Sequence, residues 1–178
     1  MSDNNVFWIW LGPYNYHADM LRRHIGELAR TYDSEAFPPH MTLFTGTHDD
    51  DGYLKRQMAA IAKAAKAPIL EIPVSGYGNS DFYWKTFYLN LKNSPQLRAL
   101  NKACRKHTDP DSEYVFKPHM SLIYKDLDAK MRRRLVRNAD PCPDTVRFDR
   151  IFLVRPSSSD KGVEDIANWR VVEQRPIS

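Results

Sequence analysis

Two short segments of the chain each place a histidine and a hydroxyl residue two positions apart. They read Phe37-Pro38-Pro39-His40-Met41-Thr42-Leu43-Phe44 and Phe116-Lys117-Pro118-His119-Met120-Ser121-Leu122-Ile123. Five of the eight aligned positions are identical, and Thr42 against Ser121 exchanges one hydroxyl for another. Each copy follows one helical segment and precedes another, so the repeat indicates a lobe duplicated within the chain.

Each copy has the pattern of a β-strand, in which successive side chains point to opposite faces. His40 therefore shares a face with Thr42, and His119 shares a face with Ser121. The proline before each histidine suits the start of a strand or an edge strand, because proline donates no hydrogen bond to a neighbouring strand. Two such strands related by a pseudo-twofold axis would bring two imidazoles and two hydroxyls to one cleft.

Two imidazoles on either side of a phosphate suit general acid–base catalysis. A neutral histidine takes a proton from water while a protonated one gives a proton to the leaving oxygen. The ordinary histidine pKa of about 6.5 makes this mixed state accessible near neutral pH. The hydroxyls of Thr42 and Ser121 would donate to phosphate oxygens, where negative charge develops. One His-x-Thr segment alone is usually structural, but the matched pair favours catalysis.

Length and composition restrict the class of protein. The 178 residues fit one domain over 1–178, and a balance of 26 − 22 = +4 charges is only mildly basic. The apolar run Val6–Leu11 is too short to span a bilayer, and the opening residues lack the pattern of a signal peptide. We expect a monomer in the cytoplasm or nucleus, without membrane contact. Cys104 and Cys142 fit no zinc or disulfide pattern, and free thiols are favoured over a single bridge.

Hydrophobic periodicity predicts four helices, interleaved with strands. The helices cover residues 17–32, 54–65, 94–104 and 128–138, and the strands lie at 6–11, 86–91, 146–153 and 169–172, besides the two repeats. A change of parity along 146–153 predicts a bulge near Arg150. Since no glycine-rich phosphate loop follows the first strand, we favour an α+β fold with antiparallel sheets over a doubly wound parallel fold.

The tetrapeptides His40–Leu43 and His119–Leu122 resemble the paired signature of the two-histidine (2H) phosphoesterases, at a separation of 119 − 40 = 79 positions. The resemblance covers essentially the whole chain. It implies a bilobal α+β fold, with two antiparallel sheets flanking a central cleft and helices outside. It also implies hydrolysis without a metal or cofactor, with catalytic His40 and His119 and phosphate-binding Thr42 and Ser121.

Within this family the chain looks most like the cyclic phosphodiesterases that open 2',3'-cyclic nucleotides and ADP-ribose 1'',2''-cyclic phosphate, in RNA and tRNA splicing metabolism. The near-symmetry of the two motifs leaves the acid and base unassigned. The resemblance implies that His119 activates water and His40 protonates the leaving oxygen. The expected partner is a small cyclic-phosphate nucleotide, which the modest charge favours over RNA. The alternatives are a phosphodiesterase or ligase acting on RNA ends or 2'–5' linkages, a non-catalytic nucleotide-binding relative, and a zinc hydrolase.

Several aromatic residues are further candidates. By resemblance Tyr124 contacts the substrate, although strict alternation places it on the opposite face unless the strand bends after Ile123. The turn-rich segment 76–84 either offers a platform for a base, with Trp84 as the stacking residue, or forms a hairpin with core aromatics. Of Trp8 and Trp10, we expect one in the cleft and one in the core.

The remaining charged and imidazole groups have simpler explanations. Two basic helix segments, at 102–107 and 132–137, either steer an anionic substrate or are ordinary solvated faces. No acidic or cysteine residue accompanies His40 or His119, so we expect no metal site. The other four histidines lack metal-ligand spacing and are expected to be structural or on the surface: His17, His24, His48 and His107.

Overall fold

The computed structural model describes residues 5–157 and 165–178, and seven strands form its sheet. In chain order these are β1 Val6–Pro13, β2 Met41–Thr47, β3 Leu70–Asn79, β4 Phe87–Leu91, β5 His119–Ile123, β6 Thr145–Arg155 and β7 Arg170–Pro176. The α-helices are α1 Asn15–Tyr32, α2 Asp51–Lys63, α3 Pro95–Thr108 and α4 Ala129–Asn138. Two 3-10 turns are η2 Tyr83–Lys85 and η4 Ile166–Asn168.

Every strand pair is antiparallel, and strand β3 joins two groups of strands. The order is β2-β1-β6-β3-β4-β5, with β7 also beside β6. The first half of β3, Leu70–Pro73, pairs with β6, and the second half pairs with β4. We call β2-β1-β6-β7 sheet A, and β4-β5 with the second half of β3 sheet B. The predicted antiparallel α+β class is confirmed.

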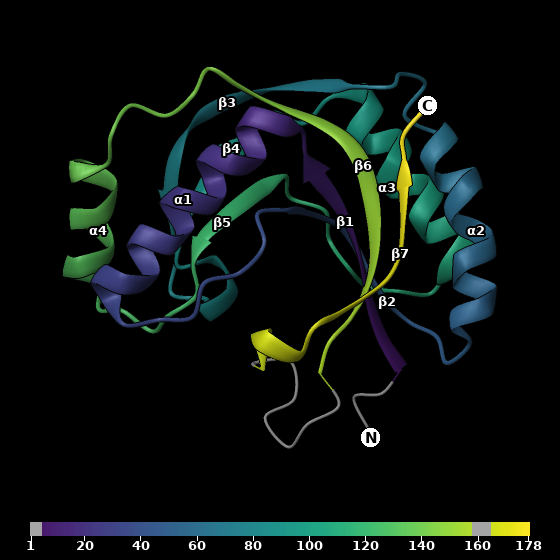
Figure 1. Cartoon of the computed structure of the whole chain (residues 1–178), viewed down its shortest axis with the longest axis horizontal. Helices are drawn as coiled ribbons and strands as arrows, with labels where there is room; N and C mark the ends of the chain where they lie inside the picture. The colour runs from purple at the N-terminus through teal and green to yellow at the C-terminus, as the bar shows by residue number, and fades with distance from the viewer. Residues whose placement is uncertain (1–4, 158–164) are drawn as a thin grey trace.

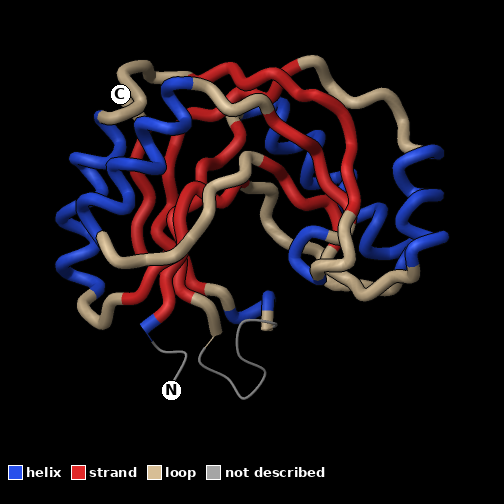
Figure 2. Tube along the Cα trace, turned by 180° about the vertical axis from the view of Figure 1, so that it is seen from behind, coloured by secondary structure: helices blue, strands red, loops and turns tan. Residues whose placement is uncertain are grey.

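The helices lie outside the arch that the two sheets form (Figures 1 and 2). Helices α2 and α3 pack together and cover sheet A, whereas α1 packs on β5 and α4 on β3 and β4. Thus α1 follows β1 of sheet A but covers sheet B, whereas α3 follows β4 of sheet B but covers sheet A. This exchange backs each repeat strand with a helix from the other half of the chain.

Local sequence explains where the helices begin and which face they bury. Asp50, Ser94 and Asp128 each accept a hydrogen bond from a backbone N–H in the first turn of α2, α3 and α4. All four helices predicted from periodicity are present. In α1 the buried residues Leu21 and Ile25 follow the predicted helical spacing.

Strand irregularities account for the places where simple alternation is inadequate. The pairing of β1 with β6 skips Asp149, so the predicted bulge near Arg150 is confirmed. Strand β3 was not predicted, and Gly76–Asn79 belongs to it rather than to a turn. Its end pairs with β4, so the segment forms a hairpin, and the aromatic residues Phe82 and Trp84 that follow line a cavity.

Two further observations concern the whole described chain. No helix within residues 5–157 and 165–178 is long and apolar enough to cross a membrane. Cys104 is buried in the core and Cys142 is half-buried, and both are free thiols, as favoured from the sequence.

Candidate active site

The two repeat histidines have the same local geometry. His40 directly precedes β2, and its Nδ1 lies 2.6 Å from the carbonyl oxygen of Pro38. His119 begins β5, and its Nδ1 lies 2.7 Å from the carbonyl oxygen of Lys117. A carbonyl oxygen only accepts hydrogen bonds, so Nδ1 carries the proton in both rings. Each neutral ring therefore keeps Nε2 unprotonated and available to exchange a proton with a ligand.

One cavity of about 750 Å³ contains both histidines. Strands β1 and β2 form one side, the η2 segment and β5 another, and the loop after α3 a third. All six residues predicted for the site line this cavity: His40, Thr42, Trp84, His119, Ser121 and Tyr124. The structure therefore brings together side chains that lie far apart in the sequence.

Burial favours the neutral form of both imidazoles. Loss of solvent lowers the pKa of His40 to about 4. The hydrogen bond that His40 Nδ1 donates to the carbonyl oxygen of Pro38 raises this pKa, and a positive charge on His119 lowers it further. Burial likewise lowers the pKa of His119 to about 4; its bond to Lys117 raises the pKa and nearby Lys85 lowers it. In the free protein both rings are therefore neutral at pH 7, and one must gain a proton to act as an acid.

The two hydroxyls differ in their hydrogen bonds. The Ser121 Oγ donates to the backbone oxygen of Trp84 over 2.7 Å, and Ser121 is buried. The Thr42 hydroxyl makes no hydrogen bond with any residue in 5–157 or 165–178. Thr42 instead contributes its backbone oxygen, which accepts from the hydroxyl of Tyr114 over 3.2 Å. Of the two motif hydroxyls, that of Thr42 can thus bind an anion without first breaking a hydrogen bond to the described residues, whereas that of Ser121 cannot.

Tyr124 reaches the cavity because β5 is irregular. In the pairing with β4, Ser121 faces Tyr88 and Ile123 faces Phe87, so Leu122 is an extra residue. The strand then ends at Ile123, and the side chain of Tyr124 lines the cavity instead of the opposite face. The ring stacks on Phe37 at a centroid distance of 3.8 Å and is 5% exposed. The bend that this placement requires is present.

The repeats and their setting match a known family. A model described as the 2'-5' RNA ligase superfamily matches residues 17–160, which contain both repeats. The chain belongs to this superfamily. The membership in the 2H phosphoesterases that the two tetrapeptides predicted is therefore confirmed.

Relatives of the superfamily align over nearly the whole chain. A protein of Arabidopsis thaliana named cyclic phosphodiesterase is 19% identical over 173 residues, which cover 94% of this chain and 93% of that protein. The crystal structure of E. coli LigT without ligand has a TM-score of 0.65 at 13% identity, covering 98% of both chains. LigT in complex with 3'-AMP has a TM-score of 0.60 at 12% identity, covering 98% of this chain and 99% of that one.

The superfamily motif does not include a cluster of tryptophans in the cavity, two of which, Trp10 and Trp169, contact the His40 ring. Trp8, Trp10 and Trp169 line the cavity together with Trp84. The expectation that either Trp8 or Trp10 lies away from the cleft is wrong, because residues two apart in a strand share a face. Trp169 lies directly before β7 and contacts Trp8 at 5.0 Å and Trp84 at 6.0 Å between ring centroids. No local motif around Trp169 marks it as a site residue.

The charges around the cavity are unevenly distributed. Lys85 lines it beside His119, and its ammonium lies 4.4 Å from the centroid of the Tyr88 ring. Burial and the nearby Lys117 lower the pKa of Lys85. Three carboxylates on the loop after α3 also line the cavity: Asp109, Asp111 and Glu113. An anionic group is therefore favoured near His119 and Lys85, and disfavoured toward this loop.

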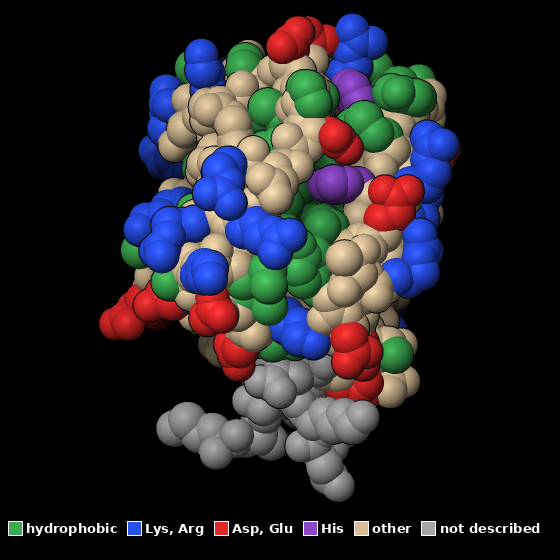
Figure 3. All heavy atoms as spheres, turned by 90° about the vertical axis from the view of Figure 1, so that its left-hand side faces the viewer, with side chains coloured by type: hydrophobic (Ala, Val, Ile, Leu, Met, Phe, Trp, Pro, Cys, Tyr) green, Lys and Arg blue, Asp and Glu red, His purple; other side chains and the backbone are tan. Residues whose placement is uncertain are grey.

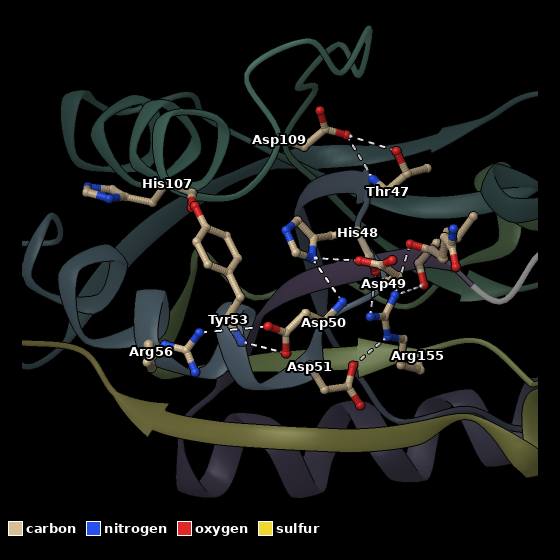
Figure 4. Close-up of polar contacts among 12 residues, drawn as sticks. Thr47, His48, Asp49, Asp50, Asp51, Tyr53, Arg56, His107, Asp109 and Arg155 are labelled. Carbon is tan, nitrogen blue, oxygen red and sulfur yellow. Dashed lines mark hydrogen bonds and ion pairs between the residues drawn. The ribbon is translucent and has the colours of Figure 1, made fainter.

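A polar network fixes the acidic loop to the end of β2 (Figure 4). The Asp109 carboxylate accepts from the backbone N–H of Thr47 over 2.8 Å. Arg105, within the basic segment 102–107, donates to the backbone oxygens of Ser112 and Tyr114. Arg105 therefore has a structural role: it holds the loop after α3 and is not part of a free basic surface.

Arg155 anchors the other side of this network (Figure 4). Its side chain is 7% exposed and donates to the Asp51 carboxylate over 2.8 Å. It also donates to the backbone oxygens of Asn5, Val6 and His48. The end of β6 is thereby joined to the start of β1 and of α2.

Among the described residues, the other histidines and the Lys and Arg side chains apart from Lys85 lie outside the cavity. His17 and His48 each accept a hydrogen bond through Nδ1 from a backbone N–H, of Arg147 and Asp50 respectively. Within the described ranges, no group of three His, Cys, Asp or Glu side chains is placed to hold a metal ion. Lys and Arg side chains gather on the face that carries α4 (Figure 3).

Proposed function

We propose that this protein is a metal-independent cyclic nucleotide phosphodiesterase that opens 2',3'-cyclic phosphates, ADP-ribose 1'',2''-cyclic phosphate, or both. One observation carries the proposal. Two imidazoles with the same Nδ1 contact to a carbonyl, and two hydroxyls on the same strands, line one cavity. This is the set of groups that general acid–base hydrolysis of a phosphodiester requires.

We assign the base to His119 and the acid to His40. Lys85 opposes protonation of His119, which suits a residue that begins the reaction neutral. His119 Nε2 takes a proton from water as the water oxygen bonds to phosphorus. The bond from phosphorus to one ribose oxygen breaks, and that oxygen takes a proton from Nε2 of His40. The product is a phosphate monoester on the other ribose oxygen, the 2'-phosphate from a 2',3'-cyclic substrate.

The negative charge of the substrate supplies the protonation that the free site lacks. A phosphodiester is anionic at neutral pH, and an opposite charge within about 4–6 Å raises the pKa of a histidine. Binding therefore favours the imidazolium of His40 beside the phosphate. The hydroxyl of Thr42 and the ammonium of Lys85 line the same cavity and are assigned to the binding of the anion.

The substrate class rests on the cavity and on the relatives. The A. thaliana relative is named cyclic phosphodiesterase, and LigT has been crystallised with 3'-AMP. Trp84 and Tyr124 lie beside the catalytic pair, with ring centroids 5.0 Å apart, and are assigned to substrate contacts. Base–aromatic stacking contributes about 1–3 kcal/mol per base. We expect Trp84→Leu to raise KM more than it lowers kcat.

A second substrate class, RNA ends, is favoured by the surface of α4. Its exposed cations Lys130, Arg133, Arg134 and Arg137 have helical spacing, and none has an ion pair within the described residues. Such a row suits the phosphates of a longer chain. Activity on an RNA with a 2',3'-cyclic end that falls steeply with salt, and falls less in a variant with these four changed to Gln, would support this class.

Hydrolysis followed by ³¹P NMR in EDTA tests the proposal. We expect undiminished activity in the chelator and a single monoester product from each substrate: the 2'-phosphate from a 2',3'-cyclic nucleotide and the 1''-phosphate from ADP-ribose 1'',2''-cyclic phosphate. A 3'-phosphate product would reverse the assigned leaving oxygen. Loss of activity in EDTA that zinc restores would instead support a metal hydrolase.

A further inference from the structure

We propose that Trp10 is a positioning residue that stabilises the imidazolium form of His40 through the face of its indole ring. The proposal rests on the assignment of His40 as the proton donor. It goes beyond that assignment because Trp10 lies outside both histidine repeats and makes no proton transfer itself.

The geometry places the two rings face to face. Trp10 and His40 have ring centroids 3.7 Å apart and planes inclined by only 14°. In the pairing of β1 with β2, Trp10 faces Thr42 and Leu11 faces Met41, so the indole lies next to the residue preceding β2. Within residues 5–157 and 165–178 the second repeat has no equivalent stack, since His119 makes an edge-on contact with Tyr88 at 5.6 Å and 72°.

Neighbouring rings hold the indole in this position. Trp10 is 4% exposed, and Trp8 stacks beside it at 5.9 Å and 12°. The ring of Trp169 meets it at 5.6 Å and 63°. These contacts restrict rotation of Trp10 away from His40, so the stack is maintained when the charge on the imidazole changes.

An aromatic face carries negative partial charge and attracts a cation above it, most strongly when that face belongs to tryptophan. At His40 the indole therefore favours the protonated ring, in opposition to the burial that favours the neutral one. Other titratable groups share the cavity: His119, Lys85, Tyr114, Tyr124, Asp109, Asp111 and Glu113. Of these, His119 opposes protonation of His40 when its own ring is protonated. The indole face is thus an attractive contact for the imidazolium inside the free protein.

Removal of Trp10 is an unsuitable test, because it also exposes His40 to water and water favours the charged form. Fluorinated tryptophans keep the size of the ring and weaken its negative face stepwise. We would install mono-, di- and trifluorotryptophan at position 10 only and measure the pKa of His40 by NMR in the protein without ligand. The expected result is a stepwise fall in this pKa of roughly half a unit to one unit in total.

The chain offers two matched controls. The same analogues at Trp8 change a ring of the same cluster for which no contact with His40 is found, and should leave the His40 pKa unchanged. The pKa of His119 should stay constant in both series. A constant His40 pKa in the position 10 series, or equal shifts from position 8, would overturn the proposal. The pKa measurements use no substrate. A failure of the proposed activity toward cyclic phosphates would therefore not change their outcome, and the two proposals can fail separately.

Discussion

The hydroxyl of Ser121 donates its proton to the backbone oxygen of Trp84 over 2.7 Å. A serine hydroxyl has one proton, so Ser121 cannot donate to a phosphate oxygen while this bond exists. Thr42, its counterpart in the first repeat, has no such bond within the described residues. The two motifs that look equivalent in sequence are therefore unequal as anion donors.

This inequality predicts unequal costs of removing the hydroxyls. Thr42→Val, which keeps the shape, should lower kcat by about 10²-fold, as for loss of a preorganised donor. Ser121→Ala should lower kcat by only about tenfold, because the hydroxyl must exchange one hydrogen bond for another. Steady-state kinetics of both variants, with Thr42→Ser as the conservative control, measure the difference. A larger loss in Ser121→Ala would show that Ser121 is the main donor.

The pH dependence of activity should reflect the burial of the histidines. The repeat alone predicts a bell centred near neutrality, but both pKa values lie at about 4 in the free protein. Because kcat/KM reports the free enzyme, its maximum should lie on the acid side of neutrality. Above pH 7 it should fall about tenfold per unit, since the acid must be protonated. The maximum of kcat should lie at higher pH, because bound phosphate raises the pKa. A flat kcat/KM from pH 5 to 9 would contradict the mechanism.

Stability should depend on pH in the same window. Well above pH 6.5 both histidines are neutral in the folded and in the unfolded chain, so they add no pH dependence to the free energy of unfolding. As the pH falls from 6.5 toward 4, the unfolded chain binds protons that the folded one excludes, and the free energy of unfolding decreases. The loss should be on the order of 2–3 kcal/mol for each histidine. Urea unfolding at several pH values measures how the free energy of unfolding changes with pH. Between pH 6.5 and 4 this free energy should fall less steeply in the double variant His40→Gln/His119→Gln than in wild type. An equally steep fall in both proteins would contradict the burial argument.

The sequence predicted the repeated elements of the fold well, and an irregular strand poorly. The apolar stripe of α1 is a local signal, and the predicted helices 94–104 and 128–138 begin at Ser94 and Asp128, the residues that cap α3 and α4. Strand β3 was missed because Pro73, Gly76 and Gly78 interrupt the alternation of polar and apolar residues. Its role depends on pairing with β6 and then β4, which no local pattern encodes.

For the site, the sequence indicated the residues with a motif and missed those that only tertiary structure brings near. The four motif residues line one cavity, as the duplicated strands predicted. Trp10 was noticed, but its stack on His40 depends on the register of β1 against β2. Trp169 and Lys85 reach the cavity from η4–β7 and η2, whose positions follow from the whole fold.

Arg155 and Arg170 offer a matched test of the network near the cavity. Both contact the carboxylate of Asp51, at 2.8 and 3.1 Å, but their side chains are 7% and 63% exposed. Arg155→Met should destabilise the fold by about 3 kcal/mol, because it leaves three backbone oxygens without their buried donor and leaves the Asp51 carboxylate only its contact with the exposed Arg170. Arg170→Met should cost less than about 1 kcal/mol. Equal effects in thermal or urea unfolding would show that burial of Arg155 does not matter.

The most direct test of the central claim compares wild type, His40→Ala and His119→Ala on 2',3'-cyclic AMP and ADP-ribose 1'',2''-cyclic phosphate in EDTA. His17→Ala, outside the cavity, serves as the control variant. We predict that wild type and the control open at least one ring, and that each of the other variants loses at least about 10²-fold in kcat. Near wild-type turnover by His40→Ala or His119→Ala would contradict two-histidine catalysis at this site.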